Sequence, residues 1–143
     1  MLKVRKWLLY GQPQKRYFII NPRYLLFAII LFVVEVLIAL YVRDSIVRPY
    51  VGDYLVVIMI YCFVKAFIKV SPLKVAIGVL LFSYMIEFLQ YFNFLEAIGL
   101  EKNKVARIVL GHGFEWMDLV AYTLGIGTVL LLEWGSNRKS RVV

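Results

Sequence analysis

Four apolar stretches, each close to the length of a membrane-spanning helix, constrain this chain more than any other feature. A helix needs about 20 mostly apolar residues to cross the hydrocarbon core of a bilayer. A soluble domain holds roughly 45–50% apolar residues, whereas 62% of these 143 residues are hydrophobic. So small a chain has too little volume to bury four such helices within itself. We therefore expect an all-α integral membrane protein with four transmembrane helices, over residues 24–42, 54–70, 73–92 and 116–133.

The remaining segments complete the predicted organisation. Residues 1–23 form a basic N-terminal segment, residues 24–133 a single four-helix transmembrane domain, and residues 134–143 a basic tail. Charged and apolar residues interleave over residues 94–110, which is typical of one or two amphipathic interfacial helices between the third and fourth spans. We expect no secretory signal peptide, because no small-residue cleavage site follows the first apolar run. A single cysteine, Cys62, excludes an internal disulfide.

The distribution of positive charge predicts the orientation in the membrane. The net charge is +8, and the basic residues lie between and beside the apolar runs rather than along one polar face. This argues against a nucleic-acid partner. Of the 17 Lys and Arg residues, twelve fall on the side of the two termini and the second loop, and five on the opposite side. Cytoplasmic loops carry the excess of Lys and Arg, so both termini are predicted to be cytoplasmic.

Several acidic residues lie inside the predicted spans, where charge is costly. One charged side chain at the centre of a membrane helix costs about 2.5–3.5 kcal/mol, so such residues often mark functional sites. With both termini inside, the acids and their polar neighbours all fall in the outer half of the membrane, beneath loops that carry Arg and His. We therefore expect an outward-facing acidic site in which Glu87 and Asp118 are the central acids and the candidate catalytic residues. Its expected ligand-binding residues are Glu35, Arg48, Asp53, Gln90, Arg107, His112 and Tyr122.

The same residues permit other interpretations. The acids could be structural, pairing with Arg48, Arg107 and tyrosine hydroxyls, although such contacts between membrane helices contribute only about 0.6 kcal/mol on average. Two facing carboxyls could act as general acid and base, and Glu, Asp and His could hold a divalent cation. The spacing matches no metal or cofactor motif, so neither a bound metal nor a cofactor is predicted. His112, between two glycines, could be a plain turn residue, and Gly125 and Gly127 are expected to permit close helix packing.

Three ordered motifs carry a family resemblance. They are Arg-Pro-Tyr-Val-Gly-Asp at residues 48–53, Glu-Phe-Leu-Gln-Tyr-Phe at residues 87–92, and GHGFEWMDLVAYTLG at residues 111–125. Over about residues 20–133 the chain resembles the DUF2809 family of uncharacterised bacterial membrane proteins. The resemblance implies a bacterial cytoplasmic (inner) membrane location and candidate site positions, but no activity.

The second half also resembles, more distantly, the VanZ-like proteins. Their pattern is a Glu-x-x-Gln, then an Arg, then an Asp followed by a polar residue and a Gly. It falls here on Glu87, Gln90, Arg107, Asp118, Tyr122 and Gly125. This chain departs from the pattern at Tyr122, where those proteins usually have Asn, and in a longer loop before Asp118. The resemblance implies a role in the cell envelope, as in glycopeptide (teicoplanin) resistance.

Two functions from different classes follow as expectations. In the first, the acidic site binds or modifies an envelope lipid, with Arg48 and Arg107 holding an anionic headgroup or a lipid-linked ligand. The alternative is a small oligomeric transporter, or a scaffold subunit of an envelope complex, without catalysis. Membrane lipids are the expected partners, a homo-oligomer is compatible with the sequence, and the residue pattern leaves open whether the protein is an enzyme.

Overall fold

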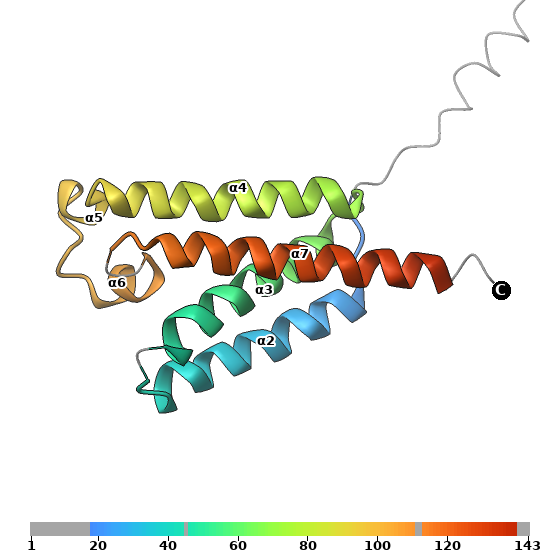
Figure 1. Cartoon of the computed structure of the whole chain (residues 1–143), viewed down its shortest axis with the longest axis horizontal. Coiled ribbons are helices and arrows are strands. Elements are labelled where there is room, and N and C mark those ends of the chain that lie inside the picture. The colour runs from blue at the N-terminus through green and yellow to red at the C-terminus, as the bar shows by residue number, and fades with distance from the viewer. Residues whose placement is uncertain (1–17, 45, 111–112, 140–143) are drawn as a thin grey trace, which may run out of the picture.

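The computed structural model describes residues 18–44, 46–110 and 113–139. Long helices run back and forth along one direction, with two short helices at one end (Figure 1). In chain order the elements are α2 (Pro22–Tyr41), the π-helical turn η1 (Val47–Val51), α3 (Gly52–Phe67), α4 (Pro72–Tyr91), α5 (Phe94–Ala97), α6 (Lys104–Leu110) and α7 (Trp116–Lys139).

The described residues contain four helical segments that are long and apolar enough to cross a membrane. They are Pro22–Tyr41, Arg48–Phe67, Pro72–Tyr91 and Trp116–Arg138. Each coincides with one predicted span, so the all-helical architecture predicted from the sequence is confirmed. The segment predicted to be amphipathic holds α5 and α6, two short helices, as expected.

The limits of two spans differ from the prediction. Pro49 and Gly52 were expected to lie in a polar loop, but Pro49 lies in η1 and Gly52 is the first residue of α3. A helix tolerates proline in its first turn, because the backbone N–H that proline lacks would be unpaired there anyway. At the other end of the chain, α7 continues past residue 133 to Lys139, so the start of the predicted tail is helical.

Helix α3 lies at the centre of the bundle and contacts α2, α4 and α7. Its buried residues Val57, Tyr61 and Cys62 pack with apolar residues of α4 and α7. In contrast, α2 contributes a single buried residue, Ala28, and most of its other apolar side chains face outward. Such a helix is suited to contact lipid on most of its surface.

Gly125 explains how closely α7 approaches α3. A Cβ atom at this position would lie 2.5 Å from Val57 Cγ2 and 2.7 Å from the carbonyl oxygen of Tyr54. Glycine is therefore required by the packing, as expected for this residue. The same expectation for Gly127 is wrong, because a Cβ there would meet nothing within 4 Å. Two residues correspond to about 200° around a helix, so the two glycines lie on opposite sides of α7.

A polar cluster joins three helices at the end of the bundle where α2 begins. The hydroxyls of Tyr24 in α2 and Tyr61 in α3 both donate hydrogen bonds to Glu133 Oε1 in α7, the latter at 2.9 Å. Lys65 donates to the carbonyl of Val70 at 2.9 Å and lies 5.6 Å from the centre of the Tyr24 ring. These contacts fix the start of α2 to the rest of the bundle.

Candidate functional site: an acidic cluster beside a polar groove

The acidic cluster consists of Asp53, Glu87, Asp118 and Tyr122. Asp53 lies in the first turn of α3, Glu87 near the end of α4, and Asp118 and Tyr122 in the first two turns of α7. Side chains four residues apart share one face of a helix, so Asp118 and Tyr122 point the same way. The cluster thus forms at the end of the bundle that carries α5 and α6, opposite the start of α2 and the end of α7 (Figure 1).

Tyr122 links two of the carboxyls. Its hydroxyl donates to Glu87 Oε1 at 2.8 Å and lies 3.4 Å from Asp53 Oδ1. A hydroxyl has one proton to donate, so the shorter contact with Glu87 is the stronger bond. The carboxyl groups of Asp53 and Asp118 also interact with each other, and two carboxyls at such close range share a proton rather than both ionise.

Two carboxyl oxygens of the cluster are buried without a hydrogen-bond partner among the described residues. Glu87 is 1% exposed, Tyr122 7% and Asp118 9%. The two oxygens are Glu87 Oε2 and Asp118 Oδ1. An unpaired buried polar atom costs free energy because it has lost its water without gaining another donor. No Lys or Arg in the described part of the chain forms an ion pair with these acids, and the neighbouring Glu115, whose backbone N–H lies toward Glu87, adds a further negative side chain.

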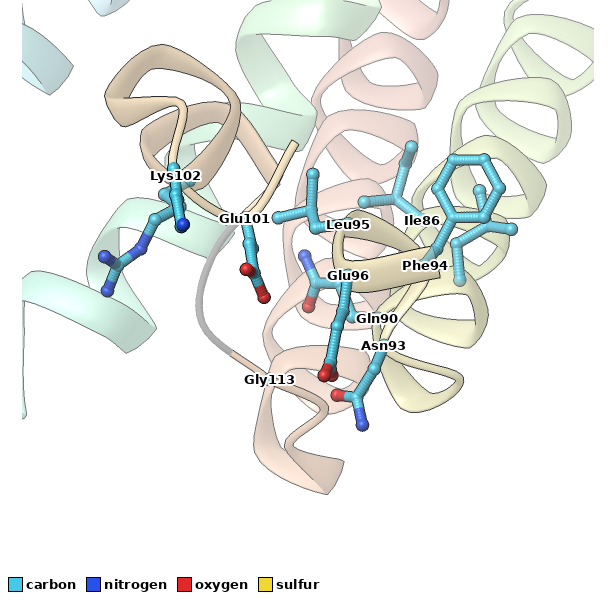
Figure 2. A pocket seen from close by; sticks show the side chains of 11 residues that line it. Ile86, Gln90, Asn93, Phe94, Leu95, Glu96, Glu101, Lys102 and Gly113 are labelled. Atoms are coloured by element: carbon cyan, nitrogen blue, oxygen red, sulfur yellow. The ribbon is translucent and has the colours of Figure 1, made fainter. Parts of the chain in front are cut away.

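A groove of about 430 Å³ lies at the same end of the bundle. Figure 2 shows its polar side chains, with the carboxyl of Glu101 between Lys102 and the side chains of Gln90 and Glu96. Helix α4 lines the groove with Ile86, Leu89 and Gln90, which lie before and after Glu87 in the sequence, whereas the acidic side chains of the cluster do not line it. The complete lining is Ile86, Leu89, Gln90, Asn93, Phe94, Leu95, Glu96, Glu101, Lys102, Arg107 and Gly113.

The shape of the groove depends on how the chain turns after α4. Asn93 has φ of 49° and Gly99 has φ of 72°, which is the left-handed region that asparagine and glycine adopt most readily. Glu96, Glu101 and Lys102 belong to the segment that these turns shape, and they line the groove together with Gln90 of α4 (Figure 2). The groove therefore combines cationic and anionic side chains on an irregular segment between two spans.

The structure divides the residues predicted from the sequence into separate groups. Glu87, Asp118, Asp53 and Tyr122 lie together in the acidic cluster, and Gln90 and Arg107 line the groove. Glu35 lies beside the cluster: its Oε2 is 3.5 Å from the position of a Cβ on Gly52, and its buried Oε1 has no partner. Arg48 is exposed on η1 and forms no ion pair within the described residues. His112 lies outside the described residues.

Part of the groove lining was not predicted. Glu96, Glu101 and Lys102 line the groove, and the interleaved charges of residues 94–110 were the signal available for them. Glu87 pairs with the Tyr122 hydroxyl, one of the kinds of partner that the structural interpretation named, and not with Arg48 or Arg107. Among the residues that the structure describes, no group of three or more His, Cys, Asp or Glu side chains could hold a metal ion, so the divalent-cation interpretation finds no support there.

The comparison with known families decides where the chain belongs. The family model described as "Protein of unknown function (DUF2809)" matches residues 42–126. The chain is a member of the DUF2809 family. The match is shorter than the predicted extent of the resemblance, but it contains the whole acidic cluster and the groove of this DUF2809 protein, whereas Glu35 and Glu133 lie outside it. No solved structure matches the chain.

Proposed function

We propose that this DUF2809 protein binds the headgroup of an envelope lipid at the acidic cluster and the adjoining groove. The observation that supports the proposal most strongly is the pair of buried carboxylate oxygens, Glu87 Oε2 and Asp118 Oδ1, that have no hydrogen-bond partner among the described residues. Buried polar atoms of native proteins are nearly always paired, so a ligand that donates hydrogen bonds accounts for them. The groove offers cationic side chains, Lys102 and Arg107, for the phosphate that lipid headgroups carry.

The proposed location is a bacterial cytoplasmic membrane, with both termini in the cytoplasm and the cluster in the outer half of the bilayer. The excess of Lys and Arg on the side of the termini supports this orientation. The cysteine-free variant Cys62→Ala is the background for two single-cysteine reporters, Asp44→Cys and Ser136→Cys. A membrane-impermeant maleimide applied to intact cells is expected to label residue 44 and not residue 136. The reverse pattern would place the cluster in the inner half and contradict the proposal.

Lipid binding is tested by native mass spectrometry of gently extracted protein. The wild-type chain is expected to carry a lipid adduct, and Glu87→Gln and Asp118→Asn are each expected to lower its occupancy about tenfold. This magnitude follows because one hydrogen bond to a charged group contributes about 1.5–3 kcal/mol and about 1.4 kcal/mol corresponds to a factor of ten. Asp44→Asn is the matched control, since Asp44 is exposed and its Oδ1 only accepts from the Ile46 N–H at 3.1 Å.

The other functions predict different outcomes of the same measurement. A stable oligomer that carries no lipid would favour the transporter or scaffold. Loss of the folded protein in both variants, measured by thermal melting in detergent, would favour the purely structural role of the acids. If the bound lipid is also altered during incubation with the wild-type protein and not with the variants, Glu87 and Asp118 act in hydrolysis or transfer at the headgroup as well as in binding.

A further inference from the structure

The partnerless oxygens of the acidic cluster restrict the kind of group that can bind there. Glu87 Oε2 and Asp118 Oδ1 belong to side chains that are 1% and 9% exposed, and neither oxygen has a hydrogen-bond partner among the described residues. An ionised carboxylate only accepts hydrogen bonds. Although Asp53 and Asp118 share a proton, a cationic donor favours the ionised carboxyls, which accept its hydrogen bonds, whereas an anionic group is repelled by them.

The charge around the cluster favours a cationic ligand. Asp53, Glu87 and Asp118 come together without a Lys or Arg in the described part of the chain, and Glu115 adds a further negative charge nearby. Buried carboxylates without a countercharge are strongly destabilising in a medium of low dielectric constant. A cationic ligand group offsets this cost. A cation therefore gains binding energy at this position that other classes of ligand do not gain.

The carboxyl oxygens of the acidic cluster favour one kind of cation over others. No group of described His, Cys, Asp and Glu side chains is arranged to hold a metal ion. A quaternary ammonium has no N–H and is recognised by aromatic cages rather than by carboxylates. A primary ammonium carries three N–H donors, which can serve Glu87 Oε2, Asp118 Oδ1 and the Asp53 carboxyl. We propose that the acidic cluster binds a primary ammonium, and that the lipid headgroup is an amine-bearing phosphate ester such as phosphoethanolamine.

The groove accounts for the other charge of such a headgroup. Lys102 and Arg107 line it together with Gln90, which follows Glu87 by three residues on α4. A guanidinium presents a planar fork of donors that matches phosphate oxygens. The zwitterionic headgroup would thus place its ammonium in the bundle and its phosphate in the groove. This inference rests on the proposed function, because it names the class of lipid that the same site takes.

The test compares three lipids with identical acyl chains: phosphatidylethanolamine, phosphatidylcholine and phosphatidylglycerol. Each is added to delipidated full-length protein in detergent, and its retention is measured by native mass spectrometry. Wild-type protein is expected to retain phosphatidylethanolamine at least about tenfold more strongly than the other two, because only its headgroup supplies N–H donors to the carboxylates. Glu87→Gln and Asp118→Asn are expected to remove this preference. Arg107→Ala is the matched groove variant and is expected to weaken all three lipids to a similar degree.

The possible outcomes distinguish failure of the ammonium site from failure of lipid binding. If wild-type protein retains none of the three lipids, the proposed function fails and the inference fails with it. If it retains all three equally, or prefers phosphatidylcholine or phosphatidylglycerol, lipid binding stands and the ammonium site is overturned. A preference for phosphatidylethanolamine that survives both carboxyl substitutions also overturns the site. Should either variant fail to fold, the wild-type comparison of ethanolamine with its trimethylated analogue still decides the matter.

Discussion

Replacing Gly125 with leucine is expected to separate α7 from α3 and to prevent recovery of folded protein. Even the Cβ of alanine would lie 2.7 Å from the carbonyl oxygen of Tyr54, a backbone atom that cannot rotate away, and 2.5 Å from Val57 Cγ2. Overpacking of this kind costs about 1–3 kcal/mol for a small addition, so we expect that penalty for Gly125→Ala and a larger one for Gly125→Leu. The hydrogen bond from the Tyr54 hydroxyl to Thr128 Oγ1, 2.9 Å long, would be lost with it.

Gly127 provides the matched control on the same helix. It faces open space, because a Cβ atom added there would have no neighbouring atom within 4 Å. Alanine favours a helix interior over glycine by about 1 kcal/mol, so Gly127→Ala is expected to be neutral or stabilising. Unfolding by SDS in mixed micelles measures both variants, and the yield of monodisperse protein reports on Gly125→Leu. Equal stability of Gly125→Ala and Gly127→Ala would refute the close contact between α3 and α7.

Removing the central pair of the acidic cluster is expected to stabilise the protein while abolishing lipid binding. In Glu87→Leu/Tyr122→Phe both members of the 2.8 Å hydrogen bond become apolar, and the partnerless Glu87 Oε2 disappears. Replacement of buried charged groups by apolar residues of similar volume is often neutral or stabilising by about 1–4 kcal/mol. We expect a gain within this range, because three acids share the site without a basic partner among the described residues.

The single substitution Tyr122→Phe is expected to act in the opposite direction. It leaves Glu87 buried with neither oxygen paired, which costs about 1–3 kcal/mol. The changes in the free energy of unfolding of the double and single variants, measured in the same detergent, therefore have opposite signs relative to wild type. If the acids served only to hold the helices together, the double variant would be less stable than the wild-type protein, and a stabilised double variant excludes that role.

The sequence was sufficient to predict the four spans because hydropathy and length are local properties. It was insufficient for their exact limits near Pro49 and Gly52, since turn-forming residues are also compatible with the first turn of a helix. Glu87, Asp118 and Tyr122 could be predicted from the cost of placing polar groups inside a span and from their helical spacing. Their nearness in space to Asp53 depends on antiparallel packing that brings the end of α4 to the start of α7.

The sequence named both arginines and tyrosine hydroxyls as candidate partners of these acids, but it did not determine which of them pair. Matching arginines in the loops suggested ion pairs, but which side chains meet depends on the path of the segment between α4 and α7, set by Asn93 and Gly99. Glu133 was overlooked because an acid at the end of a span is also compatible with exposure to water. Only the packing of α2 shows that Tyr24 and Tyr61 donate to it.

The sparse burial of α2 has a consequence for the variation that the protein tolerates. Only Ala28 of this helix is buried, and most of its other apolar side chains face outward. A surface that meets fluid acyl chains imposes no shape on its residues, so one aliphatic side chain can replace another there without loss. Tyr24 and Glu35 are the exceptions, since each meets a specific neighbour. We therefore expect α2 to tolerate more variation among aliphatic residues than α3 and α7.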